Sequence, residues 1–160
     1  MDKILGIIYG WFETIYGSNL SEYLWGYNCD TQTYENPNLF NSIGLITLAI
    51  ALLVVLLYYY GFNHPRLNRA KHWFLFLGVA ALINFLIAWQ YLVSDFNVGK
   101  IQDCLIYVRD DSGDILAKLL YTDDFWKFGI VNAVVSAIAF TVFSFMFKWG
   151  SRNCKHSPVW

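Results

Sequence analysis

Three long runs without a charged side chain constrain this chain more than any other feature. A helix needs roughly 20 apolar residues to cross the hydrocarbon core of a bilayer. Runs of that kind occupy residues 39–62, 73–94 and 128–147. Only 14% of the residues are charged, against about 25% in an ordinary soluble domain, so three buried core helices of a soluble protein fit poorly. The sequence therefore predicts an all-α membrane protein with three transmembrane helices.

Aromatic residues mark the expected ends of these helices, because Trp and Tyr prefer the interface between membrane and water. Tyr58–Tyr60 end the first run, Trp73 opens the second, and Trp126 and Trp149 flank the third. The expected segments are an extracytoplasmic N-terminal segment (1–37), transmembrane helix 1 (38–62), a cytoplasmic basic loop (63–72), transmembrane helix 2 (73–94), an extracytoplasmic hairpin (95–124), transmembrane helix 3 (125–148) and a cytoplasmic basic tail (149–160).

Charge is divided unevenly among the connecting segments. Residues 63–72 and 148–160 each carry three bases and no acid. Residues 1–38 hold one base against five acids, and residues 95–127 hold four bases against seven acids. Short loops rich in Lys and Arg stay in the cytoplasm. With three spans the two basic segments must share a side, so the counts predict an inner (plasma) membrane protein with its N-terminus out and its C-terminus in.

The first 28 residues are apolar but are interrupted by glycines and by Glu13. They fit an amphipathic helix that lies in the outer interface, because apolar residues recur at helical spacing. A fourth span and a cleaved signal peptide are alternatives, although the segment is short and lacks a basic start and a small-residue cleavage site. Asn19 with Glu22 resembles a capping box that opens a second short helix over 20–27. The recurring apolar residues are Ile4, Ile7, Ile8, Trp11 and Ile15.

Residues 95–124 form the only sizeable soluble segment. Residues 104–109 resemble a strand, residues 111–114 a turn, and residues 115–121 the return strand of a hairpin. The last stretch also fits a short helix, because its apolar residues share one helical face. A lone hairpin is marginally stable in water, so it should pack on the N-terminal helices or on a copy from another subunit.

Two of the three cysteines, Cys29 and Cys104, fall on the predicted outer side, where disulfides persist. A bond between them would tie the N-terminal segment to the hairpin and stabilise a small exterior cap. The alternative is two separate buried thiols. Cys154 falls on the reducing side and is expected to be free.

Sequence motifs for catalysis are missing. There is no HxxxH, HExxH, GxSxG or CxxC pattern, no Gly-rich phosphate loop, and no acid inside a predicted span. Intramembrane enzymes and proton-coupled carriers usually need an ionisable group at depth. We therefore expect no enzymatic activity, no cofactor and no metal site, and interpret the acidic pairs at 110–111 and 123–124 as solvated charges.

Polar residues within the spans are the first set of candidate functional residues. Gly129, Asn132 and Ser136 share a face of the third span, and Asn84 and Gln90 lie in the second. One interpretation is helix packing, because small and polar residues hold membrane helices together. The other is a pore in which several copies present this face to a central water path. Three helices cannot easily enclose a conduit alone, so a pore would require a homo-oligomer.

Basic residues of the cytoplasmic segments are the second set of candidates. By default they determine topology and sit near anionic headgroups of the lipid bilayer. Repeated around a symmetric oligomer, they would form a ring attractive to a nucleotide or oligonucleotide. The net charge of −1 shows no excess that would suit duplex nucleic acid. These candidates are Arg66, Arg69, Lys71, Arg152 and Lys155.

In overall layout the chain resembles the small membrane channel effectors of bacterial antiphage defence, such as the Hailong channel effector. The resemblance lies in the number of spans, the short soluble parts and the basic inner segments. It implies a homo-oligomeric channel, such as a tetramer, that is gated by a cytoplasmic nucleotide-type signal and disrupts the membrane of infected cells. Gating would then involve the basic residues, and conduction the face around Asn132 and Ser136.

Two other functions remain. The lack of catalytic groups equally fits a non-conducting structural or assembly subunit of a membrane complex. The run at 29–42 (CDTQTYENPNLFNS) resembles the start of alkaline ceramidases. Those enzymes need metal-binding histidines in several spans, and no predicted span here contains a histidine.

Overall fold

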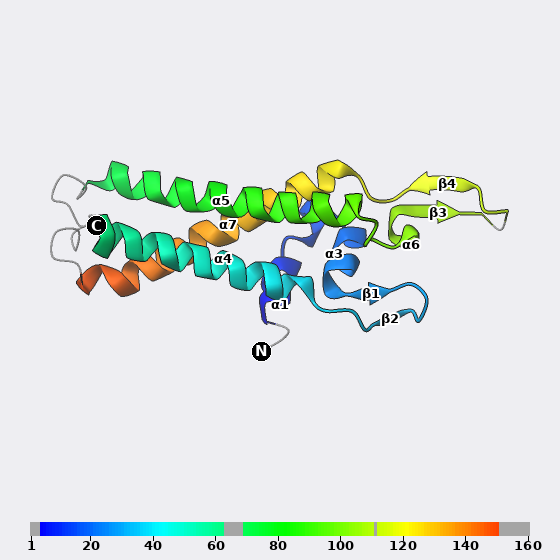
Figure 1. Cartoon of the computed structure of the whole chain (residues 1–160), viewed down its shortest axis with the longest axis horizontal. Coiled ribbons are helices and arrows are strands. Elements are labelled where there is room, and N and C mark those ends of the chain that lie inside the picture. Colours follow the sequence, from blue (N-terminus) through cyan, green and yellow to red (C-terminus); the bar gives the residue numbers. More distant parts are fainter. Residues whose placement is uncertain (1–3, 63–68, 111, 151–160) are drawn as a thin grey trace. The chain divides into compact units, whose positions relative to one another are not determined.

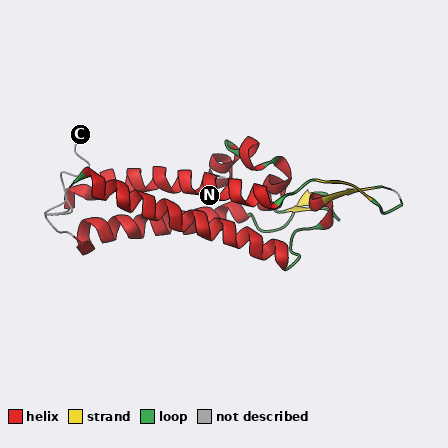
Figure 2. Ribbon diagram, turned by 90° about the horizontal axis from the view of Figure 1, so that it is seen from above, coloured by secondary structure: helices red, strands yellow, loops and turns green. Residues whose placement is uncertain are grey.

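Helices dominate the computed structural model, which describes residues 4–62, 69–110 and 112–150 (Figures 1 and 2). Within these ranges three helices are long and apolar enough to cross a membrane, as the sequence predicted. They are Leu39–Phe62, Ala70–Asn97 and Thr122–Gly150.

Each candidate span has its own helical form. The first begins as α4 (Leu39–Leu56) and ends in a π-helical segment, η1 (Leu57–Phe62). The second is a single helix, α5 (Ala70–Asn97), three residues longer at each end than the apolar run. The third is α7 (Thr122–Phe147), followed by the 3-10 turn η3 (Lys148–Gly150).

Helix α5 ends in a Schellman motif built on Gly99. This glycine has a φ of +75°, a left-handed conformation that costs glycine little. The N–H of Gly99 donates to the carbonyl of Phe96 (3.1 Å), and the N–H of Lys100 donates to the carbonyl of Asp95 (3.0 Å). The chain reversal therefore brings Lys100 back beside Asp95.

The chain folds into two compact units, which we describe separately. The first unit comprises Met1–Gly44 and Ile87–Val131, and the second comprises Leu45–Leu86 and Asn132–Trp160. In the second unit, buried residues of the three candidate spans form one apolar core. These residues are Ala51, Val54, Val55, Tyr58, Tyr59, Trp73, Ala80, Ala139 and Phe140.

Large apolar side chains also cover the outside of the second unit. Leu53, Leu75 and Ile138 are 57%, 61% and 57% exposed. Exposed large apolar side chains on all three helices are what a bilayer would cover. The three apolar helices therefore suggest a membrane location.

Three short helices form near the N-terminus, where an amphipathic helix and a second short helix over 20–27 were expected. They are α1 (Ile4–Gly10), α2 (Glu13–Tyr16) and α3 (Ser18–Trp25), of 7, 4 and 8 residues. None approaches the length needed to span a bilayer, so the alternative of a fourth span in this segment is wrong. The predicted capping box is also wrong, because α3 begins at Ser18 with Gly17 as its N-cap and no side-chain cap bond.

Aromatic stacking holds these helices in the core of the first unit. The ring of Tyr9 lies 5.4 Å from that of Phe40 on α4 and 5.5 Å from that of Phe128 on α7. Tyr16 packs edge-on against Phe128 (5.3 Å), and its hydroxyl donates to the carbonyl of Tyr9 (3.1 Å). Each pair gains from its ring geometry as well as from burial.

Two small antiparallel strand pairs complete the first unit. Strands β1 (Tyr27–Asn28) and β2 (Thr33–Tyr34) form a pair that was not predicted from the sequence. Strands β3 (Tyr107–Arg109) and β4 (Ile115–Lys118) pair with Tyr107 opposite Lys118 and a bulge after Val108.

The strand expected from residue 104 starts later than the sequence suggested. Asp103–Ile106 form a helical turn, α6, so the strand assignment is wrong for Cys104 to Ile106. Leu105 and Ile106 are both buried. A strand would direct these adjacent side chains to opposite faces, whereas one helical turn lets both face the interior.

Candidate functional site

Four polar side chains from all three candidate spans meet inside the second unit. Thr47 Oγ1 donates to Asn132 Oδ1 (2.9 Å), and Asn132 Nδ2 donates to the backbone carbonyl of Asn84 (2.8 Å). Asn84 Nδ2 donates to Ser136 Oγ (2.7 Å) and to the carbonyl of Ala80 (3.0 Å). We call this set the polar ladder: Thr47, Asn84, Asn132 and Ser136.

The polar ladder faces the inside of the protein. Its four residues are at most 1% exposed. Polar groups in an apolar surrounding are costly unless they are hydrogen-bonded. Here the partners come from the same chain, and among these side chains the exception is Asn84 Oδ1, which is buried without a hydrogen-bond partner. The geometry is that of helix packing, in which polar side chains join neighbouring spans. The predicted pore-lining residues Asn84, Asn132 and Ser136 thus do not lie on a surface that another copy could reach.

The other two pore candidates fall in the first unit. There Gly129 is buried within α7, whereas Gln90 is exposed on α5. Neither belongs to the polar ladder in the part of the chain that the structure describes.

Two further hydrogen bonds between spans were not expected from the sequence. Trp73 Nε1 donates to Ser144 Oγ (3.1 Å), and the Tyr60 hydroxyl donates to the carbonyl of Phe147 (3.1 Å). Both aromatic residues were expected only to mark the ends of spans. A signal for Ser144 was present, because it is one of the few polar residues within the apolar run 128–147.

The structure describes two of the five basic candidates. Arg69 is exposed just before α5, and Lys71 is exposed in its first turn. Arg66, Arg152 and Lys155 lie outside the described residues. The ligand-binding ring predicted for this set stays a prediction.

A disulfide joins Cys29 and Cys104 in the first unit, with Cα atoms 6.4 Å apart. This separation lies within the usual range for disulfides. Gln102 supports the same junction, because its Oε1 accepts from the N–H of Cys29 (2.7 Å) and its Nε2 donates to Asn28 Oδ1 (3.2 Å). The end of β1 and the residue after it are thereby fixed to α6 and the residue before it.

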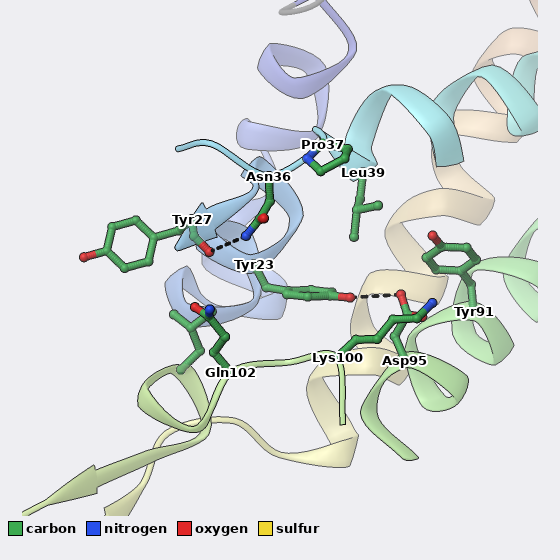
Figure 3. Close-up of a pocket in the computed structure, with 10 residues that line it drawn as sticks. Tyr23, Tyr27, Asn36, Pro37, Leu39, Tyr91, Asp95, Lys100 and Gln102 are labelled. Atoms are coloured by element: carbon green, nitrogen blue, oxygen red, sulfur yellow. Dashed lines mark hydrogen bonds and ion pairs between the residues drawn. The ribbon is translucent and has the colours of Figure 1, made fainter. Parts of the chain in front are cut away.

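A cavity of about 310 Å³ opens beside this junction in the first unit (Figure 3). Its most buried charged group is Asp95, which is 3% exposed. The Tyr23 hydroxyl donates to Asp95 Oδ2 (2.9 Å), and Lys100 Nζ donates to Asp95 Oδ1 (2.6 Å). The cavity is lined by Tyr23, Tyr27, Asn36, Pro37, Leu39, Tyr91, Asp95, Lys100, Gln102 and Leu105.

The two groups that donate to Asp95 both have raised pKa values. Burial, and then the bond to Asp95, raise the pKa of the Tyr23 hydroxyl well above its usual range. The hydrogen bond to Asp95 also raises the pKa of the Lys100 ammonium. Tyr23 therefore stays neutral and Lys100 stays charged at neutral pH.

The chemistry open to this site is binding of a polar or charged group. Among the described residues, no group of three or more His, Cys, Asp or Glu side chains could hold a metal ion. No family model matches the chain, and neither a curated protein nor a solved structure was found to match it.

Proposed function

We propose that the chain is an integral protein of the inner (plasma) membrane, with its N-terminus outside and its C-terminus in the cytoplasm. The three long apolar helices and their exposed apolar faces support a bilayer location. The division of charge supports the orientation, because both segments without an acid, 63–72 and 148–160, must lie on one side.

A reporter experiment tests this orientation. Fluorescent protein fused after residue 160 should fold and fluoresce, because that end lies in the cytoplasm, whereas alkaline phosphatase at the same place should stay inactive. The matched fusion site lies in the turn at 112–113, where phosphatase should be active. The reverse pattern at both sites would overturn the orientation while leaving the three spans in place.

Within the membrane, the function we propose is that of a non-conducting structural or assembly subunit of a membrane complex. The polar ladder carries this proposal. Asn84, Asn132 and Ser136 were candidates for a water path, and each is buried and forms a hydrogen bond within one chain. Opening them to water would break hydrogen bonds that join all three spans.

A homo-oligomeric channel is the second candidate, favoured by a groove on the exposed face of α7. Small side chains at Ala137 and Thr141 allow a second helix to approach closely. In this version the pore runs between copies and is gated at the cytoplasmic basic residues by a nucleotide-type anion, as in an antiviral effector. Asn132 and Ser136 would hold the subunit together without lining the pore. The groove is lined by Val134, Ala137, Ile138, Thr141, Val142 and Phe145.

Molar mass in detergent and ion flux from liposomes separate the two candidates. The subunit function predicts a monomer without flux that joins a second membrane protein in native membranes. A homo-oligomer that conducts ions would instead support the channel function. In that case Ala137→Leu should dissociate the oligomer and stop flux, and Ala49→Leu, the same change on the exposed face of α4, should do neither.

A further inference from the structure

The cavity in the first unit contains a buried carboxylate that needs a cation. Asp95 is 3% exposed, and a buried charge is tolerated only when it is paired and hydrogen-bonded. Tyr23 supplies a neutral hydrogen bond. The positive charge comes from Lys100 alone among the described lining residues.

The ammonium of Lys100 is a replaceable occupant of the position beside Asp95. Its backbone is fixed by the Schellman motif, but its side chain is 59% exposed, against 5% for Asp95. The lysine end of this pair is already solvated, and its flexible stem can carry the ammonium into water. Lys100 can therefore move out into solvent while Asp95 stays in place, which leaves a vacant cation position.

Aromatic rings stand beside this cation position. Figure 3 shows the hydroxyl of Tyr23 directed at Asp95 and Tyr91 beside the Asp95–Lys100 pair, whereas the ring of Tyr27 points away. The faces of aromatic rings attract ammonium groups, and a carboxylate with aromatic walls is a common arrangement for organic cations. The cavity of about 310 Å³ lies at the lower end of the range of small-molecule pockets.

The position along the chain indicates where such a cation would come from. Asp95 lies two residues before the end of α5 at Asn97, and α5 is a candidate span. The end of a membrane span lies at the level of the lipid headgroups. An alkylammonium headgroup would therefore be available to the cavity from the bilayer itself.

We propose that this cavity binds an organic ammonium group, which displaces Lys100 from Asp95. The shared chemistry is an alkylammonium, carried either by a phospholipid headgroup such as phosphatidylethanolamine or by a free amine. This inference goes beyond the proposed function, because it requires only that the first unit is folded at a membrane surface. It holds equally for a structural subunit and for a channel.

Titration of the purified full-length protein with ethanolamine and choline tests the proposal, with sodium chloride matched for ionic strength. Lys100→Met removes the internal competitor and should strengthen binding about fivefold. Asp95→Asn removes the anion and should abolish binding. Asp103→Asn is the matched control, since Asp103 is an exposed carboxylate that pairs with Arg109 in the same unit, and its binding should equal that of the original protein.

The two cavity variants should change ammonium binding in opposite directions, which distinguishes a binding site from a purely structural contribution. Weaker binding in Lys100→Met, or unchanged binding in Asp95→Asn, would overturn the proposal. Retention of the Cys29–Cys104 disulfide reports that the first unit is folded. If Asp95→Asn does not fold, the comparison of Lys100→Met with the original protein decides, and the absence of a gain overturns the proposal.

A lipid arm identifies the source of the ammonium. The protein is exchanged into nanodiscs with equal phosphatidylethanolamine and phosphatidylglycerol, and retained lipids are measured by native mass spectrometry. Enrichment of phosphatidylethanolamine that is lost in Asp95→Asn assigns the headgroup. If the two lipids are retained equally but soluble ethanolamine binds, the ligand is a free amine. If the two lipids are retained equally and soluble ethanolamine does not bind, the site is rejected.

Discussion

The side chain of Asn132 connects three helices at one point in an apolar surrounding. Its Oδ1 accepts from Thr47 on α4, and its Nδ2 donates to the carbonyl of Asn84 on α5. An asparagine inside a span is costly when alone, so its position is stable only while both partners remain. The association of helices in the second unit therefore depends on a few buried hydrogen-bonded pairs.

Replacing Asn132 with leucine should destabilise the protein. The change keeps the side-chain volume but removes both bonds and leaves Thr47 and the Asn84 carbonyl without these partners. Interhelical hydrogen bonds in membrane proteins contribute about 0.6–2 kcal/mol each, so we expect a loss of about 1–3 kcal/mol. Unfolding in mixed micelles with added dodecyl sulfate measures it.

Thr141→Val is the control for Asn132→Leu. The Thr141 hydroxyl donates to the carbonyl of Ala137 in its own helix (2.8 Å), so its loss should change stability much less. Equal stability of the two variants would mean that the ladder contributes nothing to helix association.

Alkaline pH should destabilise the first unit through Tyr23 and Lys100. The pKa values of both groups are raised above their ordinary values of 10.0 and 10.5. A raised folded-state pKa gives stability that is fully present below the unfolded value and is lost as pH rises through the folded one. Stability should therefore be constant to about pH 10 and then fall.

Thermal unfolding followed by tryptophan fluorescence between about pH 8 and pH 11 measures this loss. Burial also raises the pKa of Tyr16 in the same unit, so Tyr23→Phe removes one of several titrations and should make the alkaline decline shallower without abolishing it. A decline with the same slope in both proteins would exclude Tyr23 as its source.

The sequence identified the residues of the ladder only in part. Asn132 and Ser136 were placed on one helical face, because periodicity alone gives that face. Thr47 was not singled out, and the choice between packing and pore stayed open. A helical wheel describes one helix and contains no information on how neighbouring helices are rotated against it. The pairing of Asp95 with Tyr23 was missed for the same reason, since they are 72 positions apart.

Among the elements, the short helix α3 depends on the residue that ends it. Gly26 has a φ of +86° and forms the left-handed C-cap. A Cβ at this position would collide with the backbone carbonyl of Asn36, which itself lies close because the Asn36 N–H donates to the carbonyl of Gly26 (3.1 Å). The glycine thus allows the chain after β2 to return against the end of α3.

Gly26→Ala should destabilise the first unit by about 1–3 kcal/mol, from left-handed strain together with the steric collision. Limited proteolysis around residues 26–38 measures the opening. Gly10→Ala is the matched control, because nothing lies within contact distance of a Cβ there, and it should be as resistant as the original protein. Equal cleavage of the two variants would contradict the structural importance of this turn.

Element prediction succeeded where composition decides and failed where local packing decides. The three candidate spans were found because long apolar runs have few other structures available. The segment before them was predicted as an amphipathic helix followed by a second short one, whereas it contains three short helices, with Gly17 between α2 and α3. The turn α6 was predicted as a strand, because β-branched and aromatic residues follow Cys104. The sequence does not show that two adjacent side chains there are both buried, which favours a helical turn.

At the scale of the whole molecule, the disulfide is the covalent link that closes the longest loop. It joins residues 75 positions apart, and closing a loop of that length removes chain entropy equivalent to about 4 kcal/mol in the unfolded state. Replacing both Cys29 and Cys104 by serine should therefore lower the stability of the first unit by about 2–4 kcal/mol.

Protease resistance of the first unit, followed with and without reductant, checks this effect. The reductant should sensitise the original protein and should leave the doubly substituted one unchanged. Identical mobility of the original protein on gels with and without reductant, together with free thiols at both positions by mass spectrometry, would dismiss the bond itself.

The disulfide between Cys29 and Cys104 also determines the order of events as the chain matures. In the proposed orientation, Cys29 reaches the exterior while its partner has not been made. At about 5–20 residues per second, the 75 intervening positions take about 4–15 s to synthesise. Both intervening spans must insert before Cys104 can reach the exterior, and Cys29 must meanwhile remain reduced and avoid other thiols. Correct assembly then depends on an oxidant that acts after insertion, and newly made chains should pass through a reduced, fully inserted stage.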